Sequence, residues 1–201
     1  MRVPVAARVL AAALAALAAI VGFTGSFPGD ERALEALNDQ FGTDLDDFMV
    51  AVGGASDTLP ILTAWVIVVA VLVRQGRRRT AVHFLSFVAG AMIGNRLFKE
   101  IVRQSRPDVR LSPESVSTFS FPSGHATNAL ALVVGLLFVL PPGRGRVAVG
   151  IVGGLGALLV AFSRLAISVH YPSDVAASVL WVGLLGVLLA PRFSRLPTPT
   201  E

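Results

Sequence analysis

The sequence predicts an all-α integral membrane protein, a six-transmembrane-helix bundle with short interfacial helices in the first outer loop. Of its 201 residues, 54% are hydrophobic and only 15% are charged, which is too apolar for a soluble domain of this length. Six apolar runs alternate with polar segments, and several of these segments carry clusters of arginine. The expected spans are residues 3–23, 59–73, 81–98, 126–140, 147–162 and 175–190, within a single domain covering residues 1–201.

The first run, residues 3–23, is long enough to cross a hydrocarbon core of about 30 Å at about 1.5 Å per residue. It is either a first span or a signal peptide, because Arg2, Arg8 and the small residues near Gly25 suit both. We expect an uncleaved span, since no clear A-x-A cleavage site stands out.

The segment from Thr24 to Asp57 carries eight acidic residues against one basic residue, so it is expected outside the membrane or on its surface. Its apolar residues recur mostly every three to four positions, which predicts short amphipathic helices at an interface. These residues are Leu34, Leu37, Phe41, Leu45, Phe48 and Met49. Two interpretations remain: a lid or lipid-access ramp, and a packed connecting helix, which is the commoner role of such connections.

The run 59–73 is short for a span, so its helix is expected to extend into the preceding Gly/Ala stretch or to tilt little. The glycines within the run 147–162 suggest close helix packing rather than a phosphate loop. His83, near one end of the run 81–98, is expected to be a structural hydrogen-bonding residue.

Arginine-rich segments predict the orientation by the positive-inside rule. They are the N-terminus, the loop Arg74 to Arg79, the loop Arg144 to Arg146 and the tail with Arg192 and Arg195. If all are cytoplasmic, the loops after spans three and five share the outer side. The expected location is the cell (inner or plasma) membrane, with the site facing the periplasm or exterior.

The composition limits the kinds of catalytic site and partner that the chain can have. The chain has no cysteine, which excludes thiolate catalysis and disulfides, and no Asp/Glu/His cluster has metal-ligand spacing, so no metal or cofactor is expected. The net charge is +4, but its arginines lie between apolar runs, so membrane orientation accounts for them better than a nucleic-acid partner does. The sequence leaves the oligomeric state open.

Cations follow the third run in the stretch NRLFKEIVRQSRP. Arg96, Lys99, Arg103 and Arg106 lie at offsets of 0, 3, 7 and 10, so a continuing helix would carry them on one face. Glu100 can neutralise part of this charge through Arg96 or Arg103. A proline after Arg106 predicts a helix boundary there.

The fourth run begins with FPSGHATNAL. Pro122 suits the first turn of a helix, which would leave the N–H groups of Ser123, Gly124 and His125 as an anion-binding N-terminus. Taken alone, this stretch reads more simply as a Ser-capped helix start with an interfacial histidine.

Between runs five and six lies SRLAISVHYPSD, Ser163 to Asp174. It sets Arg164, His170 and Asp174 at the junction of two apolar segments, where ionisable side chains are costly and usually functional. We expect His170 to be a nucleophile that Asp174 orients, and Arg164 to hold an anion, on an outward-facing connection.

Together the stretches read K-x6-R-P, P-S-G-H and S-R-x5-H-x3-D, in that order. This resembles the tripartite signature of the type 2 phosphatidic acid phosphatase family, integral membrane lipid phosphatases whose fold and phosphate site are similar to those of vanadium haloperoxidases. All three motifs match, over Lys99 to Asp174.

The resemblance implies catalytic roles that the chemistry of the side chains also supports. His170 would attack phosphorus, Asp174 would fix its tautomer, and His125 would act as general acid and then general base. The phosphate oxygens would be bound by Lys99, Arg106, Ser123, Gly124 and Arg164.

A site at the outer interface suits a lipid phosphomonoester or diphosphate as the substrate. The resemblance implies undecaprenyl diphosphate, phosphatidic acid and phosphatidylglycerol phosphate as candidates. The loop Asp108 to Phe121 either shapes the entrance or is a plain solvent-facing connection. The alternative function is a transporter or binding protein for an anionic headgroup, although such a protein would not need His170 and Asp174 in relay.

Overall fold

The structure, a computed structural model, describes residues 3–41, 45–108 and 119–193, and within these residues every regular element is a helix. The elements are α1 (Val5–Thr24), α2 (Asp30–Phe41), α3 (Asp46–Gly54), α4 (Thr58–Arg74), α5 (Arg78–Val102), α6 (Gly124–Val139), α7 (Arg144–Ala148), the π-helical turn η1 (Val149–Gly153), α8 (Gly154–Ala166) and α9 (Pro172–Phe193). The all-α prediction is confirmed.

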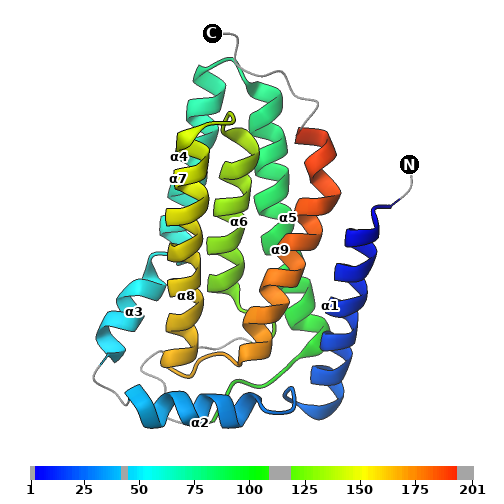
Figure 1. Cartoon of the computed structure of the whole chain (residues 1–201), viewed down its shortest axis with the longest axis vertical. Helices are drawn as coiled ribbons and strands as arrows, with labels where there is room; N and C mark the ends of the chain where they lie inside the picture. Colours follow the sequence, from blue (N-terminus) through cyan, green and yellow to red (C-terminus); the bar gives the residue numbers. More distant parts are fainter. Residues whose placement is uncertain (1–2, 42–44, 109–118, 194–201) are drawn as a thin grey trace.

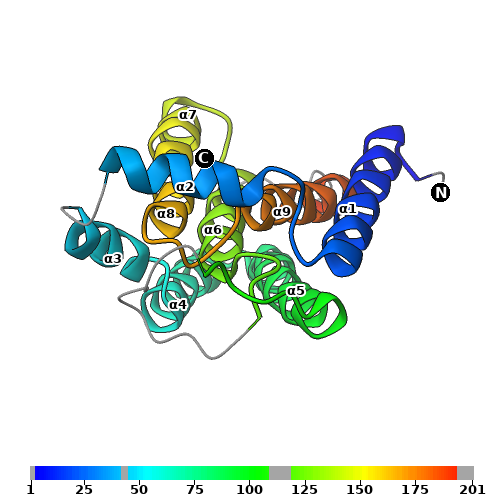
Figure 2. The ribbon, with the colours of Figure 1, turned by 90° about the horizontal axis from the view of Figure 1, so that it is seen from below.

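The long helices run side by side along the long axis of the molecule (Figure 1). Helix α6 lies in the middle of the bundle, in contact with α5, α8 and α9, while α1 packs on the outside of α9 (Figure 2). Helix α2 crosses one end of the bundle and contacts α8 and α9. At that same end the three motifs meet, whereas the α4–α5 and α6–α7 connections lie at the opposite end.

Five stretches are long and apolar enough to cross a membrane. They are Val5–Thr24, Asp46–Arg74, Arg78–Val102, Arg144–Ala166 and Pro172–Ala190. The expected fourth span is the shorter apolar helix α6, which has 16 residues.

Most helices extend beyond the predicted spans, because the prediction followed apolar runs and stopped at ionisable residues. Arg164 lies in the last turn of α8 and Asp174 in the first turn of α9. The expectation that both lie on a connection is therefore wrong, since the residues between the two helices are only 167–171.

Two other local expectations need correction. The stretch before the second run is helical, but it forms the separate helix α3, which the turn at residues 55–57 divides from α4. Helix α5 ends at Val102, because Arg103 adopts a left-handed backbone conformation with φ of 52°. Arg106 therefore does not continue the helical face of Lys99, and it reaches the site from the segment that follows the helix.

The core forms where α4, α5, α6 and α9 meet, around the buried rings of Phe84 and Phe87. Within a bilayer such packing stabilises the bundle through van der Waals contact between the helices rather than through removal of apolar surface from water. Closer to the site, Gly94 lies against the indole of Trp181, where a Cβ atom would overlap the ring. The Trp181 Nε1–H donates to the carbonyl of Ala91 at 2.9 Å, which fixes α9 against α5.

Other expectations for the helices are met in part. Gly153 packs against Val133 of α6, as the close-packing interpretation predicts, whereas a Cβ on Gly154 would meet open space. His83 is hydrogen-bonded through Nδ1 to the carbonyl of Arg79, the structural role expected for it.

Helix α2 attaches to the α8–α9 connection through buried polar contacts. The carboxylate of Asp30 accepts hydrogen bonds from the backbone N–H and the hydroxyl of Ser173, at the start of α9. Ser168 donates its hydroxyl proton to the side-chain oxygen of Asn38 at 3.0 Å. The segment thus packs on the protein through its polar contacts and through the buried Leu34, which favours the connecting-helix interpretation.

Candidate functional site

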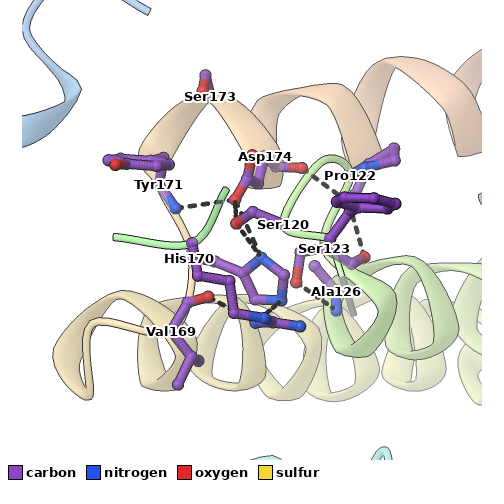
Figure 3. A network of polar contacts seen from close by, with 12 residues as sticks. Ser120, Pro122, Ser123, Ala126, Val169, His170, Tyr171, Ser173 and Asp174 are labelled. Carbon is purple, nitrogen blue, oxygen red and sulfur yellow. Dashed lines mark hydrogen bonds and ion pairs between the residues drawn. The ribbon is translucent and has the colours of Figure 1, made fainter. Parts of the chain in front are cut away.

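His170 and Asp174 form a buried pair at the end of the bundle that α2 crosses (Figure 3). The Nδ1 atom of His170, on the α8–α9 connection, lies 3.0 Å from Oδ2 of Asp174, four residues further along the chain in α9. The same oxygen accepts hydrogen bonds from the Tyr171 backbone N–H, at 2.9 Å, and from the Ser120 hydroxyl. A carboxylate held by three donors fixes the imidazole as the tautomer protonated at Nδ1.

The opposite ring nitrogen of His170 faces Arg106. Nη1 of Arg106 lies 3.3 Å from Nε2 of His170 and donates to the carbonyl of Val169 at 2.6 Å. Burial lowers the pKa of His170 well below its usual value, and the nearby positive charges of Arg106 and Lys99 lower this pKa further. The ring is therefore neutral at pH 7, with its Nε2 lone pair directed at a guanidinium.

Lys99 extends from the last turn of α5 into the same region. Its ammonium group donates to the carbonyls of Phe119 and Ser120, the latter at 3.0 Å, and its side chain is buried. These two carbonyls belong to the chain segment that also carries the Ser120 hydroxyl. The lysine therefore ties α5 to the residues that precede α6.

Helix α6 begins at Gly124, two residues after Pro122, and is capped by Ser123 as the simpler interpretation of this stretch predicts. Pro122 precedes the helix and Ser123 is the N-cap, whose hydroxyl accepts from the Ala126 N–H at 3.5 Å. The backbone N–H of Ser123 donates to the carbonyl of Asp174 at 3.2 Å, so it is not one of the unpaired donors that the sequence suggested. Asn95 donates to the Thr127 hydroxyl at 3.0 Å and fixes this turn to α5.

Arg164 is completely buried under helix α3. Its Nη2 atom donates to the carbonyl of Met49 at 2.9 Å, and Nε donates to the Ser163 hydroxyl at 3.1 Å. A Cβ atom on Gly53 would overlap the guanidinium. The arginine thus occupies space that only a glycine on α3 leaves available.

His125, in the first turn of α6, faces the start of α4. Its Nε2 atom lies 2.8 Å from Oδ1 of Asp57. The His125 side chain is 23% exposed and that of Asp57 is 59% exposed, so this pair is in contact with solvent, unlike His170 and Asp174.

The structure therefore brings the motif residues from α5, α6, α8 and α9 to one end of the bundle. Within the described residues, the cations near His170 are Lys99, Arg106 and Arg164, against the carboxylate of Asp174; the other buried carboxylate at this end, Asp30, accepts hydrogen bonds from Ser173. An excess of positive charge at low dielectric is stabilised by an anion. The arrangement suits phosphate bound next to a neutral histidine.

Two side chains that contact the site residues, Ser120 and Asp57, were not predicted from the sequence. Ser120 donates to Asp174 and lies 3.2 Å from Nδ1 of His170. Asp57, more than sixty residues before its partner, faces His125. In the described part of the chain, no group of three or more His, Cys, Asp or Glu residues is arranged to hold a metal ion.

A comparison with protein families matches residues 80–196 to the PAP2 superfamily, which is more than half of the chain and includes all three motifs. The chain belongs to the PAP2 superfamily. Helices α1 to α4, and with them Asp57, lie outside the residues matched by the PAP2 model.

Curated relatives of this PAP2 protein include the decaprenylphosphoryl-5-phosphoribose phosphatase of Mycobacterium tuberculosis, 36% identical over 50% of this chain and 56% of that protein. The undecaprenyl-diphosphatase BcrC of Bacillus subtilis is 34% identical over 62% of this chain and 63% of that protein. The chain thus matches less than two thirds of the length of these relatives.

The PAP2 fold is also found among solved structures. A transmembrane PAP2-type phosphatidylglycerolphosphate phosphatase from Bacillus subtilis superposes with a TM-score of 0.76 at 26% sequence identity. The superposition covers 94% of this chain and 95% of the other, so the similarity includes α1 to α4.

Proposed function

We propose that this PAP2 protein is a phosphatase that hydrolyses a lipid phosphomonoester or diphosphate through a phosphohistidine intermediate, without a metal ion. The observation that carries the proposal is the geometry at His170. Its Nδ1 faces the Asp174 carboxylate at 3.0 Å and its Nε2 faces the guanidinium of Arg106 at 3.3 Å. A neutral nucleophile is thus oriented toward a group that binds phosphate.

In the first step Nε2 of His170 attacks phosphorus, a P–N bond forms and the P–O bond to the leaving group breaks. His125 gives its proton to the leaving oxygen. In the second step His125 takes a proton from water, whose oxygen attacks phosphorus, and the P–N bond breaks to release inorganic phosphate. Asp174 stays ionised and stabilises the positive charge that His170 acquires.

Cationic side chains would stabilise the equatorial phosphate oxygens, whose charge must be balanced in the transition state. The proposed ligands are Lys99, Arg106, Ser123, Gly124 and Arg164. Arg106 would turn from Nε2 of His170 to the phosphate as substrate enters. Three cations in this position supply the charge that a divalent metal provides in other phosphatases.

The topology that we propose is a single domain of six spans, with α6 as the shorter one. The α4–α5 connection, with Arg74, Arg77 and Arg78, and the start of α7, with Arg144 and Arg146, lie at the end of the bundle opposite the α8–α9 connection (Figure 1). This supports a cytoplasmic assignment of that end. The site would then face the periplasm or exterior, with α2 and α3 as the interfacial helices.

The proposed substrate class follows from this location and from the relatives. A phosphate site at a membrane surface suits a lipid whose headgroup lies at that depth. Undecaprenyl diphosphate, phosphatidic acid and phosphatidylglycerol phosphate are the candidates, and the relative from Mycobacterium tuberculosis adds decaprenylphosphoryl-5-phosphoribose. Residues 109–118 of the expected entrance loop lie outside the described residues.

The decisive experiment measures phosphate release by the purified protein in detergent, with a chelator, across a panel of these lipids. We expect turnover of at least one lipid, and loss of turnover in His170→Ala but not in the matched variant His83→Ala. Activity that disappears only when metal is removed, or that survives in His170→Ala, contradicts the mechanism. Binding without phosphate release would favour a transporter or headgroup-binding protein.

A further inference from the structure

The contact between Asp57 and His125 joins a PAP2 motif to a part of the chain that the PAP2 model does not match. Asp57 immediately precedes α4, and its Oδ1 atom lies 2.8 Å from Nε2 of His125. The two residues are 68 positions apart in sequence. The contact therefore depends on how the α3–α4 turn is held against α6.

That turn is fixed by contacts of its own. The buried Ser56 donates its hydroxyl proton to the carbonyl of Gly53 at 3.0 Å. The carbonyl of Ser56 in turn accepts from the amide of Asn128 at 3.2 Å, one turn after His125 on α6. Two successive residues of the turn thus contact the same face of α6. These contacts hold the backbone of Asp57 next to the imidazole of His125.

We propose that Asp57 is a positioning residue for His125 in the phosphatase reaction; this inference rests on the proposed function. By accepting a hydrogen bond from Nε2–H, the carboxylate orients the ring so that Nδ1 carries the proton that moves. In the first step this proton passes from Nδ1 to the leaving oxygen as the P–O bond breaks. In the second step Nδ1 takes a proton from the attacking water, and Asp57 remains ionised throughout.

The two His–Asp pairs differ in a way that matches different roles. The side chains of His170 and Asp174 are 2% and 0% exposed, which suits a neutral nucleophile whose Nε2 must stay unprotonated. The side chains of His125 and Asp57 are 23% and 59% exposed, so this pair reaches the water that the second step consumes. The carboxylate of Asp57, 2.8 Å from Nε2, stabilises the protonated ring that the first step requires.

The test compares leaving groups in Asp57→Asn. An alkyl phosphate, such as a short-chain phosphatidic acid, needs a proton on its leaving oxygen, whereas p-nitrophenolate leaves without one. We expect kcat for the alkyl phosphate to fall by about 10–100-fold, the usual effect of removing a partner from a functional histidine. The first burst of p-nitrophenolate from p-nitrophenyl phosphate should change by less than about threefold, because that step does not require the acid.

Two controls isolate the effect. Asp47→Asn removes an exposed carboxylate from the neighbouring helix α3 and should leave both substrates unaffected. Asp57→Glu keeps the carboxylate and should recover part of the alkyl phosphate rate. Thermal unfolding in detergent tests that each variant is folded.

The outcomes separate this inference from the proposed function. Equal losses for both leaving groups in a folded Asp57→Asn variant, an unchanged rate, or a faster rate would each overturn the positioning role. The proposed function fails on different results, obtained without any Asp57 variant: no phosphate release by the wild-type protein from any ester in the panel, activity that disappears only when metal is removed, or activity that survives in His170→Ala.

Discussion

The Nη1 atom of Arg106 lies 3.3 Å from Nε2 of His170, on the side of the ring opposite Asp174. The nitrogen proposed to attack phosphorus is therefore covered by a cation when no substrate is bound. An incoming phosphate supplies stronger acceptors than a neutral imidazole does, so it can draw the guanidinium away and expose the lone pair. In the proposed mechanism Arg106 would therefore cover the nucleophile first and then bind the phosphate.

Arg106→Ala should lower kcat/KM for the lipid substrate by about 10²–10³-fold, the effect of removing one donor to the transition-state oxyanion. The measurement is phosphate release under chelator. Arg96→Ala is the matched control, because Arg96 is 66% exposed and pairs with Glu100 at 3.5 Å outside the site. Equal activities of the two variants would exclude Arg106 from phosphate binding.

The proposed mechanism requires a neutral His170, so activity should fall at a pH low enough to protonate this residue. Burial and the neighbouring cations lower this pKa well below 6.5, so His170 stays neutral as the pH falls through 6.5 and becomes protonated only at lower pH. Below pH 6.5 the unfolded chain binds a proton at this position that the folded chain does not, so the free energy of unfolding decreases as the pH falls.

NMR titration of the imidazole nitrogens checks this directly, since the chain has only three histidines. Variants at His83 and His125 assign the remaining signal. Arg106→Ala removes a positive charge and should move the His170 midpoint to higher pH. A wild-type midpoint at or above 6.5 is the result that this account does not allow.

Gly53→Ala should displace Arg164, because the added Cβ overlaps the guanidinium that donates to Met49. Small displacements of a group that positions substrate reduce rates by up to about 100-fold, so we expect a loss of about tenfold or more in kcat/KM. Gly90→Ala is the control: it adds the same methyl group to α5, where nothing lies within 4 Å. An active Gly53→Ala enzyme would show that Arg164 tolerates movement.

Asp30→Ala should destabilise the protein by about 1–3 kcal/mol, because it leaves the buried N–H and hydroxyl of Ser173 without their acceptor. Thermal unfolding in detergent measures the change. Asp39→Ala removes an exposed carboxylate from the same helix and should have no effect. If both variants unfold at the wild-type temperature, the contact between α2 and α9 does not contribute to stability.

Much of this architecture is readable from the sequence because the signals are local. Long apolar runs predict the helices, and the spacing of four residues in the third motif predicts that His170 and Asp174 lie close together. The helix ends are less predictable. Arg164 and Asp174 are charged, so the sequence pattern places them outside the apolar runs. Both are nevertheless helical and buried, because each has a hydrogen-bond partner within the bundle.

The missing parts of the site depend on contacts between distant segments. Ser120 approaches Asp174 across 54 positions, and Asp57 approaches His125 across 68. The close approach of Gly53 to Arg164 likewise exists only once α3 is packed on α8. No spacing within one helix or turn encodes such pairs, so they appear only when the chain is folded.

The contact between α2 and the start of α9 can form only late in synthesis, because its two partners are far apart in the sequence. Asp30 leaves the ribosome 143 residues before Ser173, and the cations on α5 follow well before His170 does. A nascent chain therefore contains Lys99 before the proposed nucleophile has been made. The site that we propose is complete only when α9, which carries Asp174, has joined the bundle, so no activity is expected before translation of that helix ends.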